Sequence, residues 1–96
     1  MILHTLNAAP SSSAFDDCLG VVRAGDAVVL MGDGVYVALA GTKAWGEIQA
    51  TGVEVYLLDS DALAAGVTAL AGAAEFIDMD GFVALTERYP RHQAWY

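Results

Sequence analysis

The sequence predicts an α/β fold in three layers, α/β/α, in which a mainly parallel sheet of four to five strands lies between helices. Two observations lead to this prediction. Residues 27–31 and 53–58 are short, continuous apolar runs, and such runs are typical of parallel strands buried on both faces. Segments with helical signals separate them. Repeated strand–helix units of this kind favour a parallel sheet covered by helices on both sides.

The N-terminal part of the chain predicts a strand followed by an amphipathic helix. Residues 1–6 are mostly apolar and form the first expected strand. Serines at 11–13 offer hydroxyl groups that cap the N-terminus of a helix, and residues 25–26 end it. The apolar face of this helix has the spacing i, i+3, i+4 and i+7. It consists of Phe15, Cys18, Leu19 and Val22.

The rest of the chain continues the alternation of strands and helices. A turn at 32–34 leads into helical segments at 35–40 and 43–50, and the buried strand at 53–58 follows. Asp59 to Asp61 then cap a helix that runs to residue 65, with Gly66 as its C-cap. The last expected elements are a small-residue connection at 70–74, a weak strand at 75–78, and a helix at 81–89 that Asp80 caps and Pro90 ends.

The composition predicts one small domain, residues 1–96, with more apolar side chains than it can bury. The chain is 56% hydrophobic with a mean hydropathy of +0.47. A domain of this size buries only roughly 60–65% of the surface of its unfolded chain, and large exposed apolar patches are rare on monomers. No uninterrupted apolar window reaches the length of a membrane span, and the first residues have no basic segment typical of a secretory signal. We therefore expect an obligate oligomer in the cytoplasm, without membrane contact.

The charge argues against direct binding of nucleic acid. The net charge is −8, with 12 acidic residues against 4 basic ones, whereas binding to phosphates depends on lysine and arginine. The chain has a single cysteine, and its two histidines lie far apart in the sequence. We therefore expect no disulfide within the chain, no bound metal and no cofactor.

The C-terminal segment predicts a contact. Chain ends usually fray in solvent, yet residues 93–96 include Trp95 and Tyr96, whose rings would each expose on the order of 150–250 Å². Such a segment docks either on its own domain or on another chain, and the apolar excess favours the second alternative. We expect an interface that includes His4, Gln93, Trp95 and Tyr96.

Two features could carry chemistry, and both have a simpler structural explanation. Cys18 lies on the apolar helix face after two aspartates, which favours a small buried core residue over a reactive thiolate. His4 is expected to be a hydrogen-bonded core or interface residue rather than a general base. Residues 32–34 stand at a strand–helix junction where phosphates often bind. They lack the spacing of a phosphate loop, and Asp33 would repel an anion, so we expect a tight turn.

The chain resembles the TusB/DsrH family of sulfur-relay subunits over essentially its whole length. The resemblance rests on residues 2–7 with Pro10, on residues 32–35, and on the closing residues 93–96. It implies the DsrE/F/H-like α/β/α fold and a complex with two paralogous subunits, one TusC/DsrF-like and one TusD/DsrE-like. In the family the catalytic cysteine belongs to the TusD/DsrE subunit and follows its third strand. Residues 58–61 contain no cysteine here, so this activity does not carry over.

The resemblance implies a non-catalytic subunit of a sulfurtransferase complex. Such a complex serves 2-thiouridine formation in tRNA in the Tus branch and sulfur oxidation in the Dsr branch. Members of the DsrH type have a cysteine in the first helix, which Cys18 matches, so the branch stays open. One alternative is a relay protein that accepts sulfane sulfur on Cys18. Another is a stand-alone homo-oligomeric binding domain.

Overall fold

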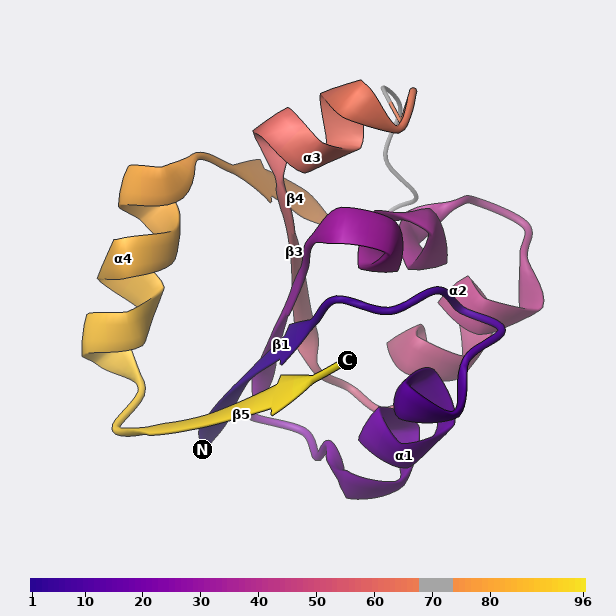
Figure 1. Cartoon of the computed structure of the whole chain (residues 1–96). Coiled ribbons are helices and arrows are strands. Elements are labelled where there is room, and N and C mark those ends of the chain that lie inside the picture. The colour runs from indigo at the N-terminus through magenta and orange to yellow at the C-terminus, as the bar shows by residue number, and fades with distance from the viewer. Residues whose placement is uncertain (68–73) are drawn as a thin grey trace.

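The fold consists of five parallel strands with helices on both sides (Figure 1). A computed structural model describes residues 1–67 and 74–96. The strands are β1 (Ile2–Leu6), β2 (Ala27–Leu30), β3 (Glu54–Leu58), β4 (Glu75–Ile77) and β5 (Arg91–Trp95). The helices are α1 (Ser13–Val21), the 3₁₀ helix η1 (Gly32–Ala38), α2 (Lys43–Gln49), α3 (Asp59–Ala64) and α4 (Met79–Arg88).

The sheet has the strand order β4-β3-β2-β1-β5, and every neighbouring pair is parallel. The chain adds β2, β3 and β4 on one side of β1, and α4 then returns it to place β5 on the other side (Figure 1). All strands therefore end at the same edge of the sheet. The three-layer prediction with a mainly parallel sheet is confirmed.

Helices cover the two faces of the sheet unequally. On one face, a large core forms between the sheet, α1, η1 and α2, and it includes Phe15, Val35 and Ile48. On the other face, α4 contributes Leu85 to a smaller core, and Tyr89 follows at its end. Figure 1 shows α4 alone on that side, with α3 above the carboxyl ends of the strands.

Side-chain caps begin three of the helices. The hydroxyl oxygen of Ser12 accepts a hydrogen bond from the Phe15 N–H, and the hydroxyl of Thr42 accepts one from the Trp45 N–H. The prediction of Asp80 as the cap of α4 is wrong, because a carboxylate oxygen of Asp78 accepts the Gly81 N–H at 2.8 Å. The helix therefore starts at Met79, two residues earlier than predicted.

Other boundaries also differ from the sequence predictions. The segment 32–34 is the first turn of η1 rather than a separate turn before it. The chain passes from β3 directly into α3, so Asp59 and Asp61 lie in the first turn of the helix, and no side chain caps it. Gly66 follows the C-cap residue and has a φ of 78°, the left-handed conformation that ends many helices. Most of the expected connection at 70–74 lies outside the described residues.

The C-terminal segment is a strand, which its sequence pattern does not predict. Arg91–Trp95 pairs with the whole length of β1. Four of its five side chains are exposed, so it lacks the apolar run that identified the inner strands. It is an edge strand. Its pairing with β1, and not the hydrophobic pattern of its own residues, makes it a strand.

Candidate functional site

Cys18 is fully buried in the second turn of α1. Its side chain belongs to the large core, together with Phe15 and Val22. Burial raises the pKa of the Cys18 thiol to about 11, because the core does not solvate a thiolate. The cause of the raised pKa is burial rather than the two aspartates that precede the residue. At neutral pH this side chain is a protonated thiol.

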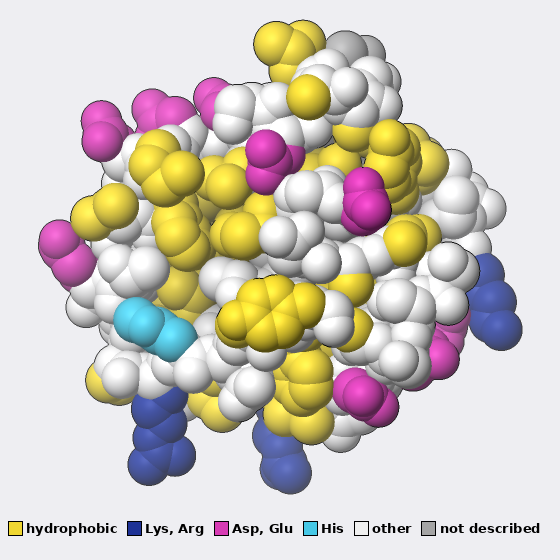
Figure 2. All heavy atoms as spheres, viewed as in Figure 1, with side chains coloured by type: hydrophobic (Ala, Val, Ile, Leu, Met, Phe, Trp, Pro, Cys, Tyr) yellow, Lys and Arg dark blue, Asp and Glu magenta, His cyan; other side chains and the backbone are white. Residues whose placement is uncertain are grey.

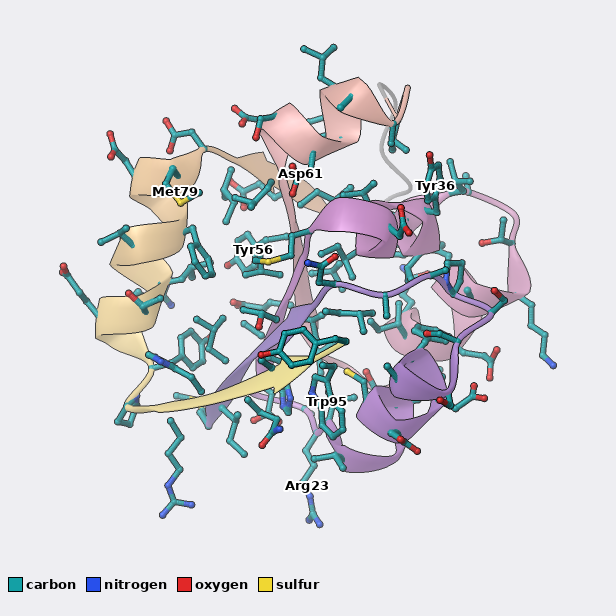
Figure 3. All side chains as sticks on the ribbon, in the orientation of Figure 1. Arg23, Tyr36, Tyr56, Asp61, Met79 and Trp95 are labelled. Atoms are coloured by element: carbon teal, nitrogen blue, oxygen red, sulfur yellow. The ribbon has the colours of Figure 1, made fainter. Side chains whose placement is uncertain are left out.

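A buried polar chain connects β5 to the interior of the sheet. The indole Nε1 of Trp95 donates to Nδ1 of His4 at 3.1 Å, and Nε2 of His4 lies 3.0 Å from Oδ2 of Asp26. His4 has no exposed surface. Its ring stacks on that of Trp95, with centroids 6.3 Å apart. Figure 3 shows Trp95 between β5 and α1, where it closes the large core.

This chain of hydrogen bonds determines the protonation of His4. An indole N–H can only donate, so Nδ1 of His4 must carry a lone pair. The ring proton then lies on Nε2 and is donated to the carboxylate of Asp26. His4 is thus a neutral imidazole in one defined tautomer, and a proton on Nδ1 would break the bond to Trp95.

Asp26 is the acceptor at the end of this chain. Besides His4, its carboxylate accepts the N–H groups of Ile2 at 2.9 Å and Arg23 at 3.2 Å. Burial alone would raise the pKa of Asp26, but these hydrogen bonds outweigh it and hold the pKa below its usual value. The sequence pattern indicates Asp26 only as part of the segment that ends the first helix. The signal in the sequence for a buried acceptor is the position of this carboxylate, directly before the fully buried strand β2.

The four residues predicted for an interface lie in different environments. His4 is interior and accepts a hydrogen bond from Trp95, which is partly buried. Gln93 is exposed on β5, and Tyr96 is 87% exposed. Within this chain, Trp95 is therefore the docked aromatic and Tyr96 is not. The interface role of these residues stays a prediction.

The segment 32–34 binds a side chain of the protein itself. The Gly32 N–H at the start of η1 donates to Oδ2 of Asp61 at 2.9 Å, so this amide already has an anionic partner. Figure 3 shows Asp61 at the start of α3, above η1. A Cβ atom at Gly34 would collide with the carbonyl oxygen of Leu6. This close approach of two backbones supports the structural interpretation of the segment.

The carboxyl ends of the strands carry acidic and apolar side chains. An open pocket beside the start of α3 is lined by Asp59, Ser60, Leu63, Val67 and Phe76. No cysteine lies there. In residues 1–67 and 74–96, no three side chains suited to a metal converge, and no helix in these ranges is long and apolar enough to cross a membrane.

Comparison with known proteins identifies the family. A family model described as DsrH like protein matches residues 8–92. The protein TusB of Pectobacterium parmentieri is 39% identical over 95 residues, which cover 98% of this chain and 100% of that protein. The protein TusB of Escherichia coli K12 is 33% identical over the same lengths.

Solved structures confirm the fold. The ychN protein of Escherichia coli superposes with a TM-score of 0.75 at 16% identity, covering 97% of both chains. Protein Tm0979 of Thermotoga maritima gives a TM-score of 0.67 at 24% identity, covering 92% of this chain and 93% of that one. At these identities the likeness concerns the fold alone. The family model and the full-length relatives show that this chain belongs to the TusB/DsrH family of sulfur-relay subunits.

Proposed function

We propose that this chain is a non-catalytic subunit of a heteromeric sulfur-relay complex, assembled with one TusC/DsrF-like and one TusD/DsrE-like paralogous subunit. The observation that carries the proposal is the state of Cys18. The only cysteine of the chain is fully buried, and its pKa of about 11 keeps it protonated at neutral pH. Accepting sulfane sulfur requires an accessible thiolate.

The carboxyl end of β3 supports the same conclusion. The resemblance places the catalytic cysteine of the TusD/DsrE subunit after the third strand. Here that position holds Asp59, Ser60 and Asp61, and the carboxylate of Asp61 is engaged by the Gly32 N–H. None of these side chains forms a persulfide. The sulfur-carrying thiol of the complex must then come from a partner.

Exposed apolar side chains support assembly with partners. On the described surface, nine large hydrophobic residues are exposed, and they occur on several elements. Figure 2 shows yellow apolar side chains beside α4 and around the end of β5. Partner subunits would remove such surface from water. The exposed set is Met1, Val21, Tyr36, Leu39, Leu63, Phe76, Met79, Val83 and Tyr96.

We assign the complex to tRNA thiolation, in which sulfur reaches the 2-thiouridine of the wobble position. Full-length likeness to proteins called TusB supports this branch. With a net charge of −8, this chain would not itself bind the tRNA.

Persulfide loading of the co-expressed complex tests the proposal. The three subunits are purified together, treated with a cysteine desulfurase and cysteine, and analysed by intact mass. We expect the mass of one extra sulfur on the TusD-like subunit and none on this chain. Cys18→Ser should leave assembly and sulfur transfer to the acceptor largely intact.

Two results would contradict the proposal. Sulfur on Cys18, with loss of relay in the serine variant, would make this chain a thiol-active carrier. A chain that fails to form a discrete complex with its paralogues, and assembles only with itself, would be a stand-alone binding domain.

A further inference from the structure

The outer edge of β5 is open. Among the described strands, β5 has no neighbour on the side away from β1. The Trp95 carbonyl oxygen accepts the Asn7 N–H at 2.9 Å, so the peptide groups of Trp95 face β1. Because backbone groups alternate along a strand, those of Gln93 also face β1, whereas the N–H and C=O groups of His92 and Ala94 point outwards.

Apart from the exposed Arg91, this edge lacks the features that usually prevent strands from pairing. The strand is five residues long and contains no proline, since Pro90 comes directly before it. Residues 88–96 contain no aspartate or glutamate, although the chain has 12 acidic residues. The surface over β5 in Figure 2 accordingly shows a histidine and no carboxylate. Two copies can approach each other here without the repulsion that their net charge of −8 causes elsewhere.

We propose that β5 pairs antiparallel with β5 of a second copy of this chain, about a two-fold axis at Gln93. The outward peptide groups at His92 and Ala94 are placed symmetrically about Gln93. In this register, His92 of each copy exchanges its N–H and C=O bonds with Ala94 of the other. The two five-stranded sheets then form one continuous sheet across an isologous interface.

The side chains fit the same register. Gln93 and Trp95 lie on the α1 face of the sheet, because they pair with His4 and Leu6 of β1, and Arg91 shares that face. Across the axis, Arg91 of each copy lies opposite Trp95 of the other. The guanidinium can then cover the exposed part of the indole ring, a favourable cation–π contact.

Gln93 already contacts one of the groups that the second copy would use. Its Nε2 donates to the Ala94 carbonyl oxygen at 3.3 Å. This bond satisfies an outward acceptor in the single chain. On pairing, the N–H of His92 in the second copy takes this position, and the two Gln93 side chains meet at the axis.

Charges at the axis give a direct test on the full-length chain. Gln93→Glu and Gln93→Lys each place two like charges opposite one another, and each should weaken the dimer at least about tenfold in analytical ultracentrifugation. An equimolar mixture of the two variants should restore a dimer that contains one copy of each. Gln49→Glu, at an exposed glutamine of α2, is the matched control and should leave the dimer unchanged.

A cysteine at the axis tests the register in the assembled complex. In a Cys18→Ala background, Gln93→Cys should form a disulfide between two copies under mild oxidation, because residues opposite each other in a non-hydrogen-bonded pair lie close together. Gln49→Cys should not. A wild-type monomer, unchanged dimers in both charged variants, or equal cross-linking at both positions would overturn the proposal.

The remaining alternative is that β5 pairs with a paralogous subunit instead of a second copy of this chain. The proposal does not depend on the sulfur-relay function, so persulfide loading can fail while the charge-swapped dimer forms. If Gln93→Glu blocks assembly with the paralogues and leaves self-association unchanged, the edge belongs to a partner subunit and the second-copy pairing is wrong.

Discussion

The two edges of the sheet differ in length, charge and support. β4 has three residues, includes Glu75, and leads into Asp78 and Asp80. β5 has five residues without a carboxylate. A short, acidic edge resists pairing with other chains, whereas β5 offers its backbone and is supported from inside by the bond from Trp95 to His4. We therefore expect pairing with another chain at β5, the strand that the buried polar chain holds in place.

Removal of residues 93–96 should have the largest effect. It deletes most of β5 and the indole that closes the large core, a change that typically costs about 3–5 kcal/mol for a large aromatic residue. For a domain of this size the melting temperature should fall by roughly 12 °C or more, and Cys18 should become reactive to iodoacetamide. Deletion of Tyr96 alone, which is 87% exposed, is the control. An unchanged melting temperature in the longer deletion would show that β5 does not support the fold.

Asp26→Asn should rank second. An amide has only one acceptor oxygen, so in either orientation its NH2 group faces an N–H that the carboxylate accepted, either that of Ile2 or those of His4 and Arg23. The loss is about 2–3 kcal/mol for a buried charged acceptor. The pKa of Asp26 is lowered in the folded protein, so its contribution is present above about pH 4, the unfolded pKa, and disappears as the pH falls through the folded pKa. The variant should therefore lose stability at pH 7 and show a flatter acid dependence in thermal melts. Asp33→Asn, at an exposed carboxylate, should retain the wild-type profile.

Trp95→Phe separates the hydrogen bond from the packing. The aromatic ring remains, but Nδ1 of His4 loses its donor and stays buried, at a cost of about 1–3 kcal/mol. We expect an intermediate loss of stability in urea unfolding, and a weaker dimer because the ring is smaller. Tyr96→Phe keeps the size of a neighbouring exposed residue and should change neither quantity. A Trp95→Phe variant as stable as the wild type would mean that the polar chain does not hold β5.

Cys18→Ala should have a small effect at neutral pH, about 1 kcal/mol for the lost sulfur atom. Its signature lies at alkaline pH. Because the pKa of Cys18 is about 11 when folded and 9.0 in its ordinary state, the folded protein resists deprotonation and loses stability as the pH rises through this interval. In thermal melts, the melting temperature of the variant should therefore fall less than that of the wild type as the pH rises. Tyr56 and Tyr89, whose pKa values are also raised by burial, should supply the remainder in both proteins.

Glu75→Thr should have the smallest effect. The side chain is exposed on the short edge strand β4, where surface substitutions usually stay within about 0.5 kcal/mol. We expect an unchanged melting temperature and an unchanged dimer in ultracentrifugation. A dimer weakened by this variant would place the pairing edge at β4 instead of β5.

Most of the architecture could be predicted from the sequence, because it depends on short-range patterns. The apolar runs that became β2 and β3 are local, and so is the spacing that places Cys18 in the core. Ser12 supplies the hydroxyl that caps α1, as the serine run indicated. Burial of an entire strand leaves a continuous apolar signal that needs no knowledge of the partner strands.

Only the tertiary structure shows that β5 is an edge strand and that the hydrogen bonds of Trp95, His4 and Asp26 support it. Nothing in the residues Arg91–Trp95 marks them as a strand, since four of the five side chains face solvent and the hydrogen-bond partners belong to β1 at the other end of the chain. Trp95 and His4 are separated by 91 positions, and Asp26 joins them from the turn before β2. Such contacts arise from the order in which strands enter the sheet, which local periodicity does not encode.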